Sequence, residues 1–135
     1  LLPLQTCFLN LIEILTDAAI MEGRFFWKVI TMTSVACYLD IETTGFSPHT
    51  AELTVLGLYI VYTPKQTALH QPYGGQITPR LLKKLLADVD TVYTYNGRRF
   101  DLPFIEAKTG ISIEKKYRHE DLMYACWNKG LRGGL

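Results

Sequence analysis

The 135-residue sequence has the composition of one ordinary globular domain, with 48% hydrophobic and 20% charged residues, which excludes disordered and fibrous proteins. The formal net charge is +1, so a strongly acidic or basic protein is also excluded. Charged residues interrupt the apolar N-terminal stretch before it is long enough to span a bilayer, and no basic segment precedes it. We therefore expect neither a membrane span nor a signal peptide. The three scattered cysteines predict no disulfide framework and favour a reducing, cytoplasmic setting.

Charge is distributed unevenly along the chain. Residues 1–79 contain three basic and six acidic residues, whereas residues 80–135 contain eleven basic and seven acidic residues. A basic second half is compatible with a polyanionic partner such as nucleic acid. The lysine pairs at residues 83–84 and 115–116 are equally compatible with a solvated surface.

Residues 1–34 form an N-terminal extension of uncertain structure, for which an extra helix or a poorly ordered segment packed on the domain is favoured. The sequence begins with Leu1 rather than Met and ends at Leu135, so we expect a fragment of a longer protein. The folded domain is expected over residues 35–135.

Three strand-like segments open this domain. Apolar residues run through residues 35–42, and Gly45 and Pro48 mark the loop that follows. Residues 53–62 are rich in β-branched and aromatic residues and predict a second strand antiparallel to the first. A weaker third strand is expected at residues 66–70.

Helices and strands alternate in the rest of the chain. Thr78 followed by proline is typical of the start of a helix, and leucines at helical spacing continue it. A strand is predicted at residues 91–95 and a helix at residues 102–109, with Asp101 as its N-cap and Gly110 after its end. A connection over residues 111–118, with a short strand near Tyr117, then leads to a helix at residues 120–128. The sequence therefore predicts an α/β domain with a mixed sheet, in which three antiparallel strands are followed by alternating helices and strands and the first strand lies near the centre of the sheet.

Two carboxylates lie on one face of the first predicted strand. Asp40 and Glu42 are two residues apart, so their side chains project to the same side, with Leu39 and Ile41 on the other. Two such charges resist joint ionisation unless a cation lies between them, and a hard divalent ion with oxygen ligands is the natural partner.

A second acidic element follows the strand at residues 91–95. Ligands of open α/β sheets collect at the carboxyl ends of strands, so Asp101 can meet Asp40 and Glu42 if the two strands are parallel neighbours. Three carboxylates and water suit Mg²⁺ or Mn²⁺.

These segments carry a family resemblance. Residues 40–45, Asp-Ile-Glu-Thr-Thr-Gly, resemble the first motif of the DEDD, or DnaQ-like, 3′→5′ exonucleases, which have the ribonuclease H-like fold. Residues 96–101, of the form Asn-Gly-x-x-Phe-Asp, are similar to their second motif. Within that superfamily the chain most resembles the YprB-type ribonuclease H-like domain, a predicted exonuclease. Residues 94–97, 100–104, 119–124 and 130–135 carry this closer resemblance, which covers residues 35–135.

The resemblance implies hydrolysis of nucleic-acid phosphodiester bonds by a two-metal mechanism. It makes Asp40, Glu42 and Asp101 catalytic metal ligands for two Mg²⁺ or Mn²⁺ ions, one generating hydroxide and the other stabilising the leaving 3′ oxygen.

The resemblance also implies contacts with the 3′ end of a nucleic acid. Asn96 and Phe100 would position the terminal nucleotide, and Thr43 would lie near its 3′ end. The sequence does not distinguish DNA from RNA or exonuclease from endonuclease action, and it indicates no oligomeric state.

One part of the family pattern is missing. The third motif of the family carries a fourth acidic ligand, usually preceded by a Tyr or His that activates the attacking water. No acidic residue follows Asp121, and His119 and Asp121 correspond to a segment before that motif. We therefore expect the domain to be incomplete at its C-terminal end and these 135 residues to be weakly active or inactive.

Simpler interpretations apply to several of these residues. Asp101 can be only a helix cap, Asn96 only part of an Asn-Gly turn, and Phe100 only a core residue. His119 is expected at the surface or behind the metal ligands, and Asp121 as the cap of the third helix.

The competing functional class is a non-catalytic nucleic-acid-binding or scaffold domain with the same fold. A proofreading domain of a polymerase is a third possibility, with the same chemistry as the free-standing exonuclease. An Asp preceded by Tyr or His at helical spacing beyond Leu135 would favour an enzyme.

Overall fold

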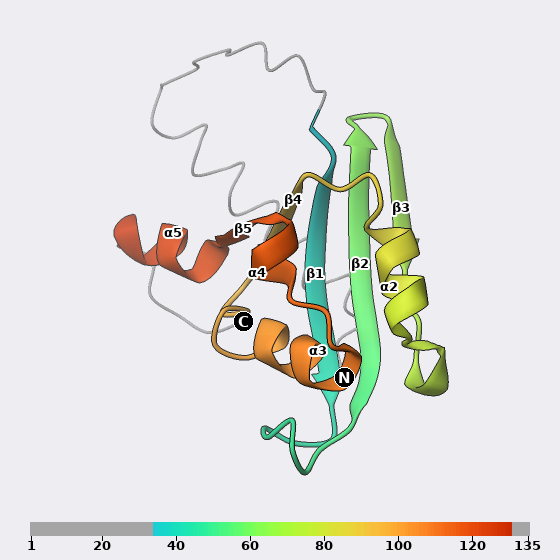
Figure 1. Cartoon of the computed structure of the whole chain (residues 1–135). Helices are drawn as coiled ribbons and strands as arrows, with labels where there is room; N and C mark the ends of the chain where they lie inside the picture. Colours follow the sequence, from blue (N-terminus) through green and yellow to red (C-terminus); the bar gives the residue numbers. More distant parts are fainter. Residues whose placement is uncertain (1–33, 131–135) are drawn as a thin grey trace. The chain divides into compact units, whose positions relative to one another are not determined.

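A five-stranded mixed sheet forms the middle of the computed structural model, which describes residues 34–130 (Figure 1). The strands lie in the order β3-β2-β1-β4-β5, so that β1 (Ala36–Thr43) is central, as the sequence predicts. The predicted N-terminal extension falls almost entirely on residues 1–33, which lie outside the described residues, as do residues 131–135.

The antiparallel part of the sheet is confirmed. β2 (Leu53–Thr63) pairs antiparallel with β1 on one side and with β3 (Gln66–His70) on the other. Side chains alternate along β1, so Leu39 and Ile41 are buried in the core. Asp40 therefore projects from the opposite face of the strand, as the alternation in the sequence predicts.

The first long helix begins where the sequence predicts. A short 3₁₀ turn, η1 (Gly74–Gln76), leads into α2 (Pro79–Leu85). Thr78 is the N-cap, and its hydroxyl oxygen accepts a hydrogen bond of 3.2 Å from the backbone N–H of Leu81. Leu82 on the inward side of α2 is buried, which fixes the helix against the sheet.

Parallel strands and short helices make up the second half of the described chain. Its elements are β4 (Thr91–Thr94), α3 (Asp101–Thr109), α4 (Ile113–Lys116), β5 (Arg118–Asp121) and α5 (Leu122–Asn128). β4 pairs parallel with β1, and β5 pairs parallel with β4. The mixed α/β fold class inferred from the sequence is thereby confirmed.

Two predictions in this half are wrong. The sequence predicts a connection over residues 111–118, but residues 113–116 form a helix that buries Ile113. It also predicts that the third helix starts at residue 120, but Glu120 and Asp121 belong to β5. The β5 segment Arg-His-Glu-Asp has no strand propensity of its own, so pairing with β4 imposes its extended backbone.

The main core lies between one face of the sheet and the helices α2 and α3 (Figure 1). Its largest fully buried side chains include Leu39, Leu56, Leu58, Ile60, Leu82, Leu86, Phe104 and Ile105. This packing fixes α3 against β1 and thereby determines where the first residue of α3 lies. Within residues 34–130 no helix is long and apolar enough to cross a membrane.

Candidate metal centre

The candidate site lies where β1 and β4 separate. β4 pairs with β1 only over residues 36–38, and among the described strands none pairs with the later part of β1 on that side. Asp101 occupies this opening, because its Oδ1 atom accepts a hydrogen bond of 3.1 Å from the backbone N–H of Ile41. β1 and β4 thus meet the condition of parallel pairing under which the sequence brings Asp101 to β1.

Asp101 is not the N-cap of its helix, contrary to the prediction. The helix begins at Asp101, and the N-cap is Phe100, whose side chain cannot accept a hydrogen bond. The Asp101 carboxyl turns instead to β1, and the residue is only 3% exposed. Burial of an acidic group is unfavourable unless it is paired, so such a group is a candidate for function.

The carboxyl groups of Asp40 and Asp101 lie near each other, and each affects the pKa of the other. Burial, together with the adjacent charge of Asp40, raises the pKa of Asp101 to about 8. Burial also raises the pKa of Asp40, and the charge of Glu42 adds to this effect while hydrogen bonds oppose it. Without a cation, the pair therefore retains one proton near neutral pH.

Glu42 lies on the same face of β1 as Asp40, two residues further along, and is partly exposed. Its charge reaches Asp40, as the raised pKa of Asp40 shows. Within residues 34–130, however, no three His, Cys, Asp or Glu side chains are gathered closely enough to hold one ion. The structure therefore brings together two of the three predicted ligands and does not gather Glu42 with them.

A divalent cation fits the Asp40–Asp101 pair in charge and in donor chemistry. The pair keeps a proton because two adjacent carboxylates repel each other, and a cation at the same place would neutralise both and release that proton. Carboxylate oxygens are the protein ligands that Mg²⁺ and Mn²⁺ prefer.

The loop between β4 and α3 determines where Asp101 lies. Asn96 adopts a left-handed backbone conformation with a φ of 60°. Gly97 follows so close to Thr94 that a Cβ atom on residue 97 would overlap the threonine side chain. The carbonyl of Gly97 accepts a hydrogen bond of 2.9 Å from the N–H of Leu102, which ties the loop to the first turn of α3.

Asp121 holds the same loop from the neighbouring strand. Its Oδ1 atom accepts hydrogen bonds from the N–H groups of Met123, at 3.1 Å, and Asn96, at 2.8 Å. Its Oδ2 atom accepts one from the N–H of Arg98 at 3.1 Å. Asp121 caps α5, as the sequence predicts, and its contact with the loop is a second role that the sequence does not signal.

His119 is buried behind the loop rather than at the surface. Its side chain is 3% exposed, and its Nε2 atom lies 2.8 Å from the hydroxyl oxygen of Thr94. Its Nδ1 atom lies 3.4 Å from a carboxylate oxygen of Glu114 but forms no hydrogen bond within the described part of the chain. Of the two positions that the sequence leaves open for His119, the structure excludes the surface.

A chain of aromatic rings runs from solvent to the core beside Asp101. Phe46 is 92% exposed, and its ring centroid lies 6.3 Å from that of Phe100, which lies 5.7 Å from that of the buried Phe104. Thr43 shapes the loop that carries Phe46, because its hydroxyl donates a hydrogen bond of 2.7 Å to the carbonyl of Gly45. Sequence reasoning names Thr43 and Phe100 but misses Phe46, whose signal is a large aromatic residue inside a turn.

The raised pKa of Asp101 predicts that the metal-free protein loses stability as pH rises from about 4 to about 8. Between the ordinary value of 3.8 and the folded value of about 8, the folded state binds a proton that the unfolded state lacks. Folding therefore becomes less favourable with rising pH, by at most about 1.4 kcal/mol per pH unit. Urea denaturation in excess chelator measures this slope. An Asp101→Asn variant with the same slope as the wild type would contradict it.

Comparison with known families places the chain by its sequence. A model of the RNase_H superfamily matches residues 37–135, which is most of the chain and includes every site residue described above. A search of curated proteins finds no match.

Several solved structures of nucleases share the fold. NrnC of Brucella melitensis bound to pGG has a TM-score of 0.53 and 24% identity, over 82% of this chain and 53% of that one. A structure described as the apo form of the nuclease has a TM-score of 0.51 and 22% identity, over 76% and 47%. Exonuclease I in complex with the inhibitor BCBP has a TM-score of 0.51 and 14% identity, over 70% and 30%. The chain thus spans about half the length of NrnC, and these similarities concern the fold.

Proposed function

Because the chain belongs to the RNase H superfamily, we propose that it forms a metal-dependent nuclease domain of the DEDD class, acting as a 3′→5′ exonuclease on DNA or RNA. The observation that carries this proposal is the pair formed by the buried Asp101 and the partly buried Asp40 at the point where two parallel strands separate. Two adjacent acids, one of them buried, are unfavourable in a fold, and their presence is explained if a cation uses them. The assignment to the YprB-type subfamily is part of the same proposal.

Asp40 and Asp101 would hold the ions, and Glu42, two residues beyond Asp40 on β1, is the proposed third ligand. When bound, two Mg²⁺ or Mn²⁺ ions supply Lewis-acid stabilisation of the phosphodiester and activate water for attack. The N–H of Ile41 keeps the Asp101 carboxyl turned towards β1, and the hydrogen bond to Leu102 keeps the start of α3 in place. The protein's own contribution is therefore to keep two carboxyl ligands together before any ion arrives.

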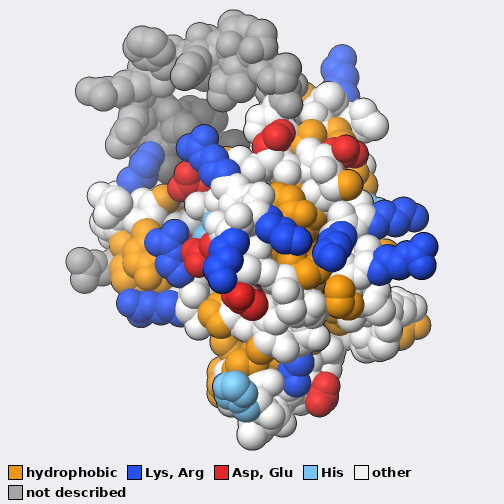
Figure 2. All heavy atoms as spheres, viewed as in Figure 1, with side chains coloured by type: hydrophobic (Ala, Val, Ile, Leu, Met, Phe, Trp, Pro, Cys, Tyr) orange, Lys and Arg blue, Asp and Glu red, His pale blue; other side chains and the backbone are white. Residues whose placement is uncertain are grey.

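The exposed ring of Phe46 suits the terminal base of a single strand. Base stacking on an aromatic side chain is tolerant of sequence, and Phe100 supports the ring from the core side. Lys and Arg side chains lie across the face that α2, α3 and α4 present (Figure 2), which favours a polyanionic partner. The description of the NrnC structure as bound to pGG supports the same partner class. Thr43 and Asn96 remain the proposed contacts to the terminal nucleotide.

Replacement of Phe46 by Ala is expected to weaken binding of a single-stranded oligonucleotide by about 5- to 100-fold, because one stacked base contributes roughly 1–3 kcal/mol. Stability should change little, since the ring is 92% exposed. Fluorescence anisotropy measures the affinity, and Phe46→Trp, which keeps an aromatic face, is the matched control. Equal affinity of the wild type and Phe46→Ala would show that no base stacks there.

The proposal is tested by incubating this chain with Mn²⁺ and a 5′-labelled single-stranded oligonucleotide, beside Asp40→Asn. The expected result is a ladder of products shortened from the 3′ end with the wild type and no such ladder with Asp40→Asn. Equal product formation by the two proteins would refute the site.

A non-catalytic binding domain is the second candidate, and one observation favours it: among the described residues only a pair, not a trio, of acidic side chains is gathered. This alternative predicts that the wild type and Asp40→Asn bind the oligonucleotide equally, that Mn²⁺ does not affect binding, and that neither protein cleaves it.

A further inference from the structure

One end of the buried His119 ring supports the close approach between Gly97 and Thr94. The His119 Nε2 atom lies 2.8 Å from the Thr94 hydroxyl oxygen, and Thr94 is only 1% exposed. The side chain of Thr94 is the surface on which Gly97 rests, since any Cβ atom at residue 97 would overlap it. A hydrogen bond that holds Thr94 in one rotamer therefore also determines how closely residue 97 approaches β4.

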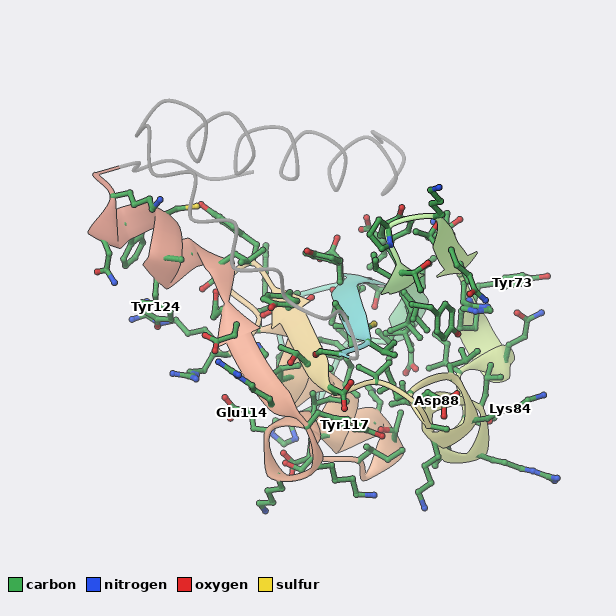
Figure 3. The ribbon with its side chains drawn as sticks, turned by 90° about the horizontal axis from the view of Figure 1, so that it is seen from above. Tyr73, Lys84, Asp88, Glu114, Tyr117 and Tyr124 are labelled. Atoms are coloured by element: carbon green, nitrogen blue, oxygen red, sulfur yellow. The ribbon has the colours of Figure 1, made fainter. Side chains whose placement is uncertain are left out.

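The other end of the ring reaches the same loop by a second path. The Nδ1 atom lies 3.4 Å from Oε1 of Glu114, and that oxygen accepts a hydrogen bond of 2.9 Å from Nε of Arg98. Figure 3 shows Glu114 on α4, beside β5. The backbone N–H of Arg98 is meanwhile bound to Asp121, so residue 98 is held through both its side chain and its main chain. The imidazole thus lies between two supports of one loop.

Stability alone does not explain this arrangement. A buried ring nitrogen without a hydrogen bond is unfavourable, and an apolar side chain of similar volume would fill the space without leaving a polar atom unpaired. If Nδ1 carries the proton of the neutral ring, it faces the Glu114 carboxylate, and Nε2 accepts the Thr94 hydroxyl proton. A leucine at residue 119 would make neither contact.

We propose that His119 is a positioning residue for the metal centre: its ring braces residues 96–98 through Thr94 and Glu114 and so determines where Asp101 enters the opening beside β1. The brace itself is a property of the fold, whereas its effect on metal binding rests on the proposed function. His119 touches neither ion nor substrate in this account and acts only through the loop.

Amide hydrogen exchange of the metal-free protein tests the brace directly, with no reference to metal or activity. His119→Leu is expected to speed exchange at Asn96 and Arg98 by about tenfold or more, since loss of a buried hydrogen bond has an effect of that size. Amides of β2, on the far side of β1, should be unaffected. His119→Gln, which can still bond the Thr94 hydroxyl, should restore protection. Unchanged exchange at residues 96 and 98, or equal acceleration throughout the sheet, would overturn the brace.

A double-mutant cycle and an Mn²⁺ titration complete the test. Thr94→Val removes the hydroxyl at nearly constant volume and leaves the Glu114 path intact, so it should reproduce part of the His119→Leu effect, and the double variant should be no worse than His119→Leu alone. Mn²⁺ affinity should fall about tenfold in His119→Leu and recover in His119→Gln, as for the outer-shell partner of a ligand. Additive effects of the two substitutions on amide exchange would contradict the positioning role. So would equal Mn²⁺ affinities of the wild type and His119→Leu, provided that the wild type binds Mn²⁺ tightly. A wild type that binds no Mn²⁺ would instead refute the proposed function, and the exchange data would still decide the brace.

Discussion

Replacement of Asp101 by Asn is expected to stabilise the metal-free protein at pH 8 and to remove its response to Mn²⁺. The variant keeps an oxygen that can accept the hydrogen bond from Ile41 but carries no charge beside Asp40. If burial raises the pKa of the carboxyl group by even one or two units, removal of the charge should increase the free energy of unfolding by roughly 1–3 kcal/mol. Mn²⁺ at 100 times its Kd should stabilise the wild type by about 2.7 kcal/mol. Its affinity for the variant should fall at least about 100-fold, since outer-shell partners alone account for 10- to 100-fold.

Urea denaturation with and without Mn²⁺ measures both effects. Asp88→Asn is the matched control, because Asp88 is exposed beyond the end of α2 and lies two residues before Asp90, whose backbone N–H binds the carbonyl of Val35 just before the start of β1. That variant should resemble the wild type under both conditions. Asp101→Asn should gain stability without metal and lose the stabilisation by Mn²⁺, and these opposite changes are diagnostic. A variant that merely misfolds would be less stable both with and without Mn²⁺. Metal-free destabilisation by Asp101→Asn would contradict the account of the pair.

Gly97→Ala should destabilise the protein by about 1–3 kcal/mol, the usual effect of forcing extra atoms into a packed site. The added methyl group would overlap the Thr94 side chain, which is buried and hydrogen-bonded to His119 and so has little freedom to move. The loop would have to lift, and because the Gly97 carbonyl binds the N–H of Leu102, the start of α3 would shift with it. Weaker Mn²⁺ binding should therefore accompany the loss of stability.

Gly75→Ala provides the matched control for this substitution. A Cβ atom on residue 75 would meet no atom within 4 Å, so the same change in composition should be close to neutral. Chemical denaturation of both variants gives the two values. If Gly97→Ala were as stable as Gly75→Ala, the close approach to Thr94 would not determine the loop.

The sheet could be predicted because its signals are local. Alternation along residues 35–42 identifies the face that carries Asp40, and β-branched residues identify β2. The Thr-Pro start of α2 follows from capping chemistry and is found where expected. Parallel pairing of β1 and β4 is the condition under which the sequence brings Asp101 to β1, and the structure meets it.

The supports of the loop could not be predicted, because each depends on residues far apart in sequence. Asp121 reads as a helix cap, and nothing in its neighbours shows that it also binds the N–H groups of Asn96 and Arg98. His119 is polar and is flanked by charged residues, so local sequence favours exposure, whereas pairing of β5 with β4 turns its ring inward. The same pairing converts the predicted helical start at residue 120 into a strand.

The ligand set is predicted only in part for a similar reason. Strand periodicity establishes that Asp40 and Glu42 share a face, but it does not establish how near Glu42 comes to a carboxylate from another element. The register between β1 and β2 shifts directly after Glu42, where Thr54 of β2 is left without a register partner on β1. Asp101 was expected to cap its own helix as well as bind metal, and it makes its contact with β1 instead.

The central claim is that Asp40 and Asp101 together hold a divalent cation. Its most direct test is a crystal structure of this chain grown with Mn²⁺, with anomalous difference density recorded to locate the ion. The account predicts a peak within coordination distance of carboxylate oxygens of both residues, absent from crystals of Asp101→Asn. A fully occupied Mn²⁺ elsewhere, with the two carboxyl groups still sharing a proton, would contradict it.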